Sequence, residues 1–102
     1  MKLNIHNLHK AFENRVRLGI MSALIAGEQM DFNRLKELLN VTDGNLASHL
    51  KALEKEEFIV VEKSFIGRKP NTQYLATNAG KKAFKAHIDA LEALIREQTG
   101  RG

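Results

Sequence analysis

The sequence predicts a mostly helical α+β domain that consists of three helices, a β-hairpin and a long final helix, within 102 residues. Apolar residues recur at helical spacing in most of the chain, which indicates amphipathic helices. One block of β-branched and aromatic residues, 58–65, departs from that spacing and predicts a strand. No repeat, low-complexity tract or linker divides the sequence. We therefore expect a single domain over residues 1–102.

The first helix is predicted over residues 8–26. Its buried stripe is formed by apolar residues that fall four apart, which places them on one face of a helix. These residues are Leu8, Phe12, Val16, Ile20 and Leu24.

The next two helices are separated by a short turn at Asn40-Val41. Asp31 is a good N-cap for a helix over 32–39, and Thr42 is a good N-cap for a helix over 42–56. Two helices joined by such a turn form a helix-turn-helix. The inward side chains of the first of them are predicted to be Leu35, Leu38 and Leu39.

The helix at 42–56 has two unlike faces. Leu46, Leu50 and Leu53 form an apolar stripe that needs burial. The opposite face carries small, polar or basic residues and no acidic one, namely Gly44, Asn45, Ser48, Lys51 and Lys55. A solvated helix face usually interleaves Glu with Lys. This face therefore favours contact with a polyanion, although each residue taken singly could be an ordinary solvated one.

The remaining chain predicts the hairpin and the last helix. The strand at 58–65 is followed by a turn at 66–71 that holds Gly67 and the single proline, and by a returning strand at 72–76. Thr77 is a plausible N-cap for the final helix, over about 78–98.

The bulk properties favour an anionic partner. The net charge is +4 and the isoelectric point about 9.6, which bears on binding rather than on fold. The absence of cysteine excludes disulfides and thiolate metal sites. No apolar run approaches the roughly 18 residues that span a membrane, and the start of the chain lacks a signal-peptide block. We expect a cytoplasmic protein without membrane contact.

Several segments in this order resemble one family. They are the helix 35–39, the run 41–54, the strand entry Phe58-Ile59, the turn 67–70 and Thr77-x-x-Gly80. Together they resemble the winged helix-turn-helix domains of MarR/ArsR-like transcriptional regulators, in their small single-domain form. The family usually has glycine where Glu57 stands, so Glu57 either adopts a left-handed conformation or the helix ends differently there.

The resemblance implies a DNA-binding transcriptional regulator of double-stranded DNA. The helix 42–56 would be the recognition helix in the major groove, and the wing 66–71 would contact the backbone or minor groove. Asn45 could pair with adenine, and Arg68 suits a narrow minor groove. The candidate DNA-binding residues are Thr42, Gly44, Asn45, Ser48, His49, Lys51, Arg34, Arg68 and Lys69.

Other functions have less support. A winged-helix module that binds protein through the same helix face is the alternative, since the net charge is modest. The sequence shows no catalytic constellation, so we expect no enzyme and no cofactor. His6 and His9 stand at a spacing that can hold a metal, but no third ligand is near, and His87 is more typical of a core or interface histidine; we therefore expect no metal site.

The apolar surface predicts a homodimer. The last helix and the start of the chain carry more apolar residues than one small domain needs. The predicted interface residues are Leu3, Ile5, Leu8, Phe84, Ile88, Leu91, Leu94 and Ile95. A two-fold dimer implies an inverted-repeat site. A small-molecule effector would have to bind at this interface or between the last helix and the rest of the domain.

Overall fold

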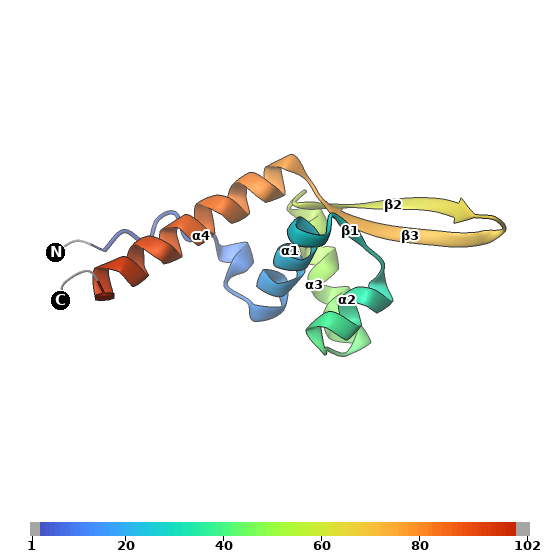
Figure 1. Cartoon of the computed structure of the whole chain (residues 1–102), viewed down its shortest axis with the longest axis horizontal. Coiled ribbons are helices and arrows are strands. Elements are labelled where there is room, and N and C mark those ends of the chain that lie inside the picture. Colours follow the sequence, from blue (N-terminus) through green and yellow to red (C-terminus); the bar gives the residue numbers. More distant parts are fainter. Residues whose placement is uncertain (1–2, 100–102) are drawn as a thin grey trace.

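The computed structural model describes residues 3–99, and Figure 1 shows a helical body with a projecting hairpin. The hairpin extends from one end of the body, and the last helix extends from the other, with the N-terminal segment beside it. The elements are the 3-10 helix η1 (Lys10–Phe12), α1 (Arg15–Gly27), β1 (Gln29–Met30), α2 (Phe32–Leu39), α3 (Asp43–Lys55), β2 (Ile59–Ile66), β3 (Lys69–Ala76) and α4 (Asn78–Thr99).

The first helix begins later than the sequence pattern predicts. Helix α1 starts at Arg15, because the Asn14 side-chain oxygen accepts the N–H groups of Val16 and Arg17 at 2.8 and 3.2 Å. The residues before this N-cap form a separate short turn of 3-10 helix, η1. The prediction of one helix over 8–26 is therefore wrong for its first residues, and Leu8 lies outside any helix.

The helix-turn-helix forms as predicted. Asp31 accepts the N–H of Arg34 at 2.8 Å at the start of α2, and Thr42 accepts the N–H of Asn45 at 3.2 Å at the start of α3. Both side chains satisfy a donor that the first helical turn leaves unpaired. The prediction that Leu38 points inward is wrong, since it is 46% exposed.

The three strands form one antiparallel sheet in the order β1-β3-β2. Strand β1, which the sequence did not predict, pairs only with Leu75 and Tyr74 of β3. Beyond that point β2 and β3 continue alone as a two-stranded hairpin, which we call the wing. Its turn is shorter than the predicted 66–71, because Ile66 already pairs with Lys69. Gly67 turns the chain at a φ of 65°, which a glycine adopts without strain.

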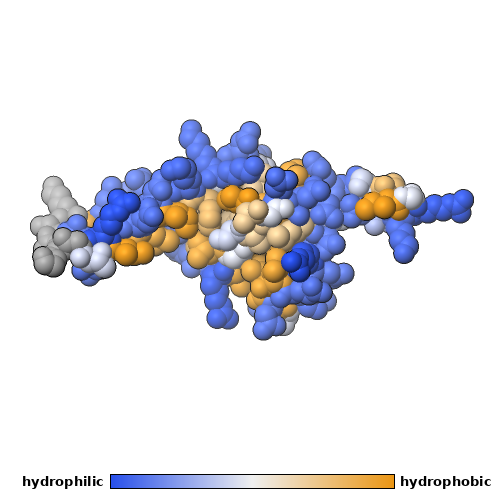
Figure 2. Space-filling model, viewed as in Figure 1, coloured by the Kyte–Doolittle hydropathy of each residue, from blue (hydrophilic) through white to orange (hydrophobic). Residues whose placement is uncertain are grey.

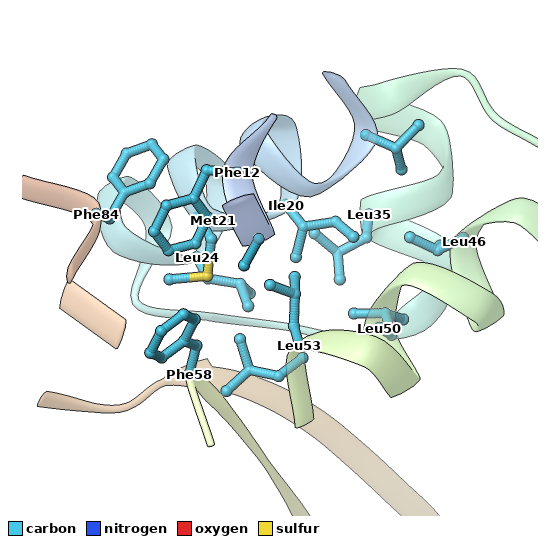
Figure 3. Close-up of a cluster of buried hydrophobic side chains, with 13 residues drawn as sticks. Phe12, Ile20, Met21, Leu24, Leu35, Leu46, Leu50, Leu53, Phe58 and Phe84 are labelled. Carbon is cyan, nitrogen blue, oxygen red and sulfur yellow. The ribbon is translucent and has the colours of Figure 1, made fainter. Parts of the chain in front are cut away.

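The core lies where the three helices meet the base of the sheet (Figure 3). Side chains from α1, α2 and α3 interdigitate there, joined by Phe58 and by Phe84 of α4. The largest fully buried ones are Phe12, Ile20, Met21, Leu24, Leu35, Leu46, Leu50 and Leu53.

A close junction joins α3, the wing and α4. Glu57 adopts a left-handed φ of 63°, so α3 ends at Lys55 and the strained alternative for Glu57 is the one observed. The Thr77 hydroxyl donates to the Glu57 carbonyl at 2.7 Å and accepts the Gly80 N–H at 2.9 Å. A Cβ added at Gly80 would overlap the carbonyl oxygen of Phe58. Only glycine fits there, which explains the Thr77-x-x-Gly80 pattern.

Candidate nucleic-acid interface

Helix α3 presents its polar face to solvent because its apolar face is buried in the core. Leu46, Leu50 and Leu53 are 0–2% exposed and pack in the core. This burial fixes the rotation of the helix about its axis. The side chains predicted to contact DNA from this helix lie on its outer surface: Thr42, Asn45, Ser48 and Lys51 are all exposed, as is Gly44.

The acidic residue near the start of α3 is neutralised within the protein. Asp43 pairs with Lys36 of α2, with 2.8 Å between Oδ1 and Nζ. A carboxylate at a helix N-terminus also interacts favourably with the helix dipole. The Asp43 charge is therefore balanced locally and does not oppose an approaching phosphate as a free charge would.

His49 differs from the other predicted contact residues because its side chain is half-buried and contacts another helix. It is half-buried, and its Nδ1 accepts a hydrogen bond from Nε of Arg17 at 3.0 Å. Burial, followed by the nearby Arg17 charge, lowers the pKa of His49. The ring therefore serves as a neutral acceptor that holds Arg17 of α1 against α3.

Arg17 is a candidate that the sequence reading missed. It is half-buried beside α3, and its guanidinium has further donors beyond the one given to His49. The two residues are 32 positions apart. No local motif joins them, so only the packing of α1 on α3 reveals the pair.

The other predicted cations lie apart from α3. Arg68 occupies the wing turn and Lys69 begins β3, both exposed, at the end of the wing away from the helical body (Figure 1). Arg34 is exposed on α2, with its guanidinium 3.9 Å from the Glu37 carboxylate. An exposed pair at that distance is weak, which leaves Arg34 able to meet a phosphate.

The predicted dimer residues divide into two groups. Leu3, Ile5 and Ile95 are 51–61% exposed, so each of them leaves apolar surface in water. Leu8, Ile88, Leu91 and Leu94 are half-buried. Phe84 is only 8% exposed and packs edge-to-face on Phe12, with ring centroids 5.3 Å apart. Its assignment to the interface is therefore wrong, because the core of the same subunit already covers it.

His87 is a core histidine that ties the N-terminal segment to α4. It is 4% exposed, and its Nδ1 accepts the backbone N–H of His9 at 2.9 Å. Both rings pack on Phe12. Burial and then the neighbouring His9 lower the pKa of His87, while Glu13 acts in the opposite direction.

Within residues 3–99, no three histidine or acidic side chains gather in a group that could hold a metal. Over the same residues, none of the helices is both long and apolar enough to cross a bilayer.

The comparisons with known proteins agree with this geometry. Residues 16–95 match the family of winged helix DNA-binding domains. An uncharacterized protein of Methanocaldococcus jannaschii is 46% identical over 79 residues, which cover 78% of this chain and 86% of that protein. The transcriptional regulator homologue protein of Pyrococcus horikoshii OT3 has a similar structure, with a TM-score of 0.80, 32% identity and coverage of 86% of this chain and 87% of its own.

A more distant structure shares the fold alone. Bordetella bronchiseptica BpsR has a TM-score of 0.71 over 96% of this chain and 74% of its own, at 9% identity.

The chain belongs to the winged helix DNA-binding domain family. This confirms the predicted fold class and the predicted function as a DNA-binding transcriptional regulator, similar to the MarR/ArsR-like proteins. DNA is accordingly its partner class.

Proposed function

We propose that the protein binds an inverted-repeat DNA site as a two-fold dimer, with α3 of each subunit in a major groove and each wing on the flanking DNA. The observation that carries this proposal is the exposed polar face of α3, held in place by the burial of Leu46, Leu50 and Leu53. An α-helix fits the major groove, where base edges present distinct donor and acceptor patterns.

On α3, each exposed side chain has a role suited to its chemistry. The Asn45 amide can donate and accept together at an adenine edge. Lys51 and the Ser48 hydroxyl can contact phosphate or base, and Gly44 lets the backbone approach closely. Thr42 uses its hydroxyl oxygen as the cap of the helix, so its further contact is with phosphate. His49 acts through Arg17 rather than on the DNA directly.

Cations away from α3 extend the footprint along the backbone. Arg34 precedes the turn of the helix-turn-helix, and Arg68 and Lys69 lie at the wing end. Contacts of this kind position a protein on the duplex without reading its sequence. We place Arg68 in or beside the minor groove, where negative potential concentrates.

The dimer is supported by the exposed apolar surface at the other end of the molecule. Leu3, Ile5 and Ile95 keep more than half of their surface in water. Leu91 and Leu94, on the same helix as Ile95, are half-buried, and Figure 2 shows an apolar band along α4. Covering such a band by a second copy removes apolar area from water at about 25 cal/mol per Å².

A two-fold dimer would set two recognition helices about 34 Å apart, one turn of DNA. Sites selected from a random duplex pool should then be inverted repeats. With 6–10 phosphate contacts, affinity should fall by about 10³ or more between about 50 and 200 mM salt.

Two substitutions test the division of labour within this interface. Asn45→Ala should erode preference at particular bases by about 1–3 kcal/mol, and Arg68→Ala should weaken binding to every duplex and flatten the salt slope by about one unit. Gel-shift titrations of selected and scrambled duplexes at several salt concentrations measure both effects. Asn78→Ala and Lys82→Ala, which remove a matching amide and a matching charge from exposed positions near the start of α4, serve as controls.

Equal losses for Asn45→Ala and Arg68→Ala on every sequence would contradict these roles. Failure of the unaltered protein to shift any duplex at low salt would favour the alternative, in which the α3 face binds protein.

A further inference from the structure

The outer half of the wing carries the most exposed large apolar side chains of residues 3–99. Phe65 is 72% exposed and Ile66 is 69% exposed. Neither supports the core, which ends near the base of the sheet. Figure 2 shows an apolar patch on the wing that is bordered by hydrophilic surface. A soluble hairpin tip needs no such residues, because turns are normally polar.

The strand register places Phe65 and Ile66 on opposite faces of the wing. Phe65 pairs with Pro70, and Ile66 pairs with Lys69. Side chains alternate along a strand, so Phe65 and Pro70 share a face with Val61 and its partner Tyr74 nearer the body. Phe65 and Pro70 thus form an apolar pair on one side of the ribbon.

That face of the wing is the one that looks toward the recognition helix. Ile59, two positions before Val61 on the same face, is buried in the core cluster that includes the α3 leucines. Burial raises the pKa of Tyr74, and the Glu54 carboxylate of α3 raises it further. A duplex that lies on α3 therefore meets the Phe65 side of the wing.

The charges on the two faces also differ. Lys63 pairs with Thr72 on the Phe65 face, which carries no carboxylate beyond Val61. Glu62 is the acidic residue of the outer wing, and it lies on the opposite face, paired with Gln73. The Phe65 face thus combines an apolar pair with a cation and with the neighbouring Arg68, which complements a polyanion.

We propose that Phe65 is an apolar wedge that inserts into the minor groove flanking the α3 site and partly unstacks one base step there. The minor groove is about 6 Å wide, so only the tip of the wing enters it. Apolar wedges that unstack bases kink the duplex, most readily at flexible TA and CA steps. Phe65 would thereby add a preference for such a step, without hydrogen bonds to bases. This inference rests on the proposed DNA-binding function.

The test compares Phe65→Ala with Ile66→Ala, a matched change at the adjacent, equally exposed position on the other face. Duplexes carrying the selected site with 2-aminopurine at successive flanking positions report unstacking by a rise in fluorescence. The unaltered protein should raise the fluorescence at one flanking step. Phe65→Ala should abolish that rise and weaken binding about tenfold, whereas Ile66→Ala should keep the rise.

Phe65→Leu should keep part of the signal, because it retains an apolar tip. Thermal melts of all variants should coincide, since the side chain at 65 is exposed.

Several results would overturn the inference. One is a fluorescence rise that survives Phe65→Ala, another is an equal effect of the two alanine variants, and a third is no rise with the unaltered protein although it shifts the duplex. Dissociation of the DNA-free dimer by Phe65→Ala would assign the patch to a second copy, and Phe65-dependent binding to phosphatidylserine vesicles would assign it to a membrane surface. If the unaltered protein binds no duplex at all, the proposed function itself fails along with the wedge.

Discussion

Helices α3 and α4 are both amphipathic, but they differ in how far the apolar face is buried and in how the charges of the polar face are paired. The apolar stripe of α3 is completely buried, while that of α4 is buried at Phe84 and still exposed at Ile95. Conversely, α4 neutralises its wet side through Lys85–Asp89 and Glu92–Arg96 pairs. On α3, within the described residues 3–99, Lys51 makes no ion pair with Glu54, three positions further on, and Lys55 has no acidic residue three or four positions away.

The difference bears on which partner each helix surface is suited to bind. A helix face whose basic residues pair with acidic residues of the same face attracts a polyanion weakly. An apolar face that is left in water is stabilised by association with another apolar face. This difference supports the proposal that α3 binds DNA and that α4 binds a second subunit. The two helices use the same amphipathic pattern for different ends.

The largest expected effect comes from a substitution in the buried apolar stripe of α3. Leu50→Ala should destabilise the protein by about 2–5 kcal/mol, because it leaves a cavity among side chains that are almost fully buried. Leu38→Ala, at an exposed leucine of the neighbouring helix, is the control and should change stability much less. Urea unfolding followed by circular dichroism measures both, and similar losses for the two variants would contradict the packing described.

A smaller effect tests the apolar side of α4. Ile95→Lys should weaken dimerisation by about 1.5–3 kcal/mol per subunit, the value of burying one large aliphatic side chain, while leaving the fold of each subunit intact. Sedimentation equilibrium over a range of concentrations follows the change, with Ser22→Lys, which adds the same charge at an exposed position of α1, as the control. An unaltered protein that sediments only as an 11.5 kDa species at micromolar concentration would rule out the dimer.

The sequence predicted α3 better than any other element, for a physical reason. Three leucines at helical spacing and a capping Thr42 specify both its rotation and its start. The start of α1 was misplaced because Leu8 and Phe12 fit the helical spacing by chance, while the decisive signal was the side chain of Asn14. Strand β1 has only two residues, Gln29 and Met30, which is too short for any pattern.

The predicted site shows the same limit. Residues on α3 could be named in advance because one periodicity orders them all. The Arg17–His49 contact and the facing of Phe65 depend on how distant segments pack and pair. Such relations have no signature in a single sequence.

The smallest expected effect concerns pH, and each of the two helices contributes one histidine to it. The pKa values of His49 and His87 are both lowered in the folded protein, first by burial. Below the ordinary value of about 6.5, the unfolded chain therefore binds more protons than the folded one. Stability should be complete above that pH and should decline as the pH falls through the lowered folded-state values.

Urea unfolding at pH 7.5 and pH 5 measures this decline. His87→Gln keeps an acceptor for the His9 N–H and should flatten the α4 share of it, while His49→Gln should flatten the α3 share. An identical decline in the unaltered protein and in both variants would assign the effect to other groups.

The close contact between Gly80 and the Phe58 carbonyl fixes the point at which α4 meets the sheet. Because the backbones touch there, the direction in which α4 leaves the sheet is coupled mechanically to the root of the wing. In a dimer whose subunits are held together through α4, a small change in the angle of α4 at this junction would move α3 and the wing of both subunits. The distance between the two α3 helices would change as a result. A ligand that changed the angle of α4 at this junction would therefore alter the spacing of the two α3 helices, and the dimer would no longer match the half-sites of its DNA.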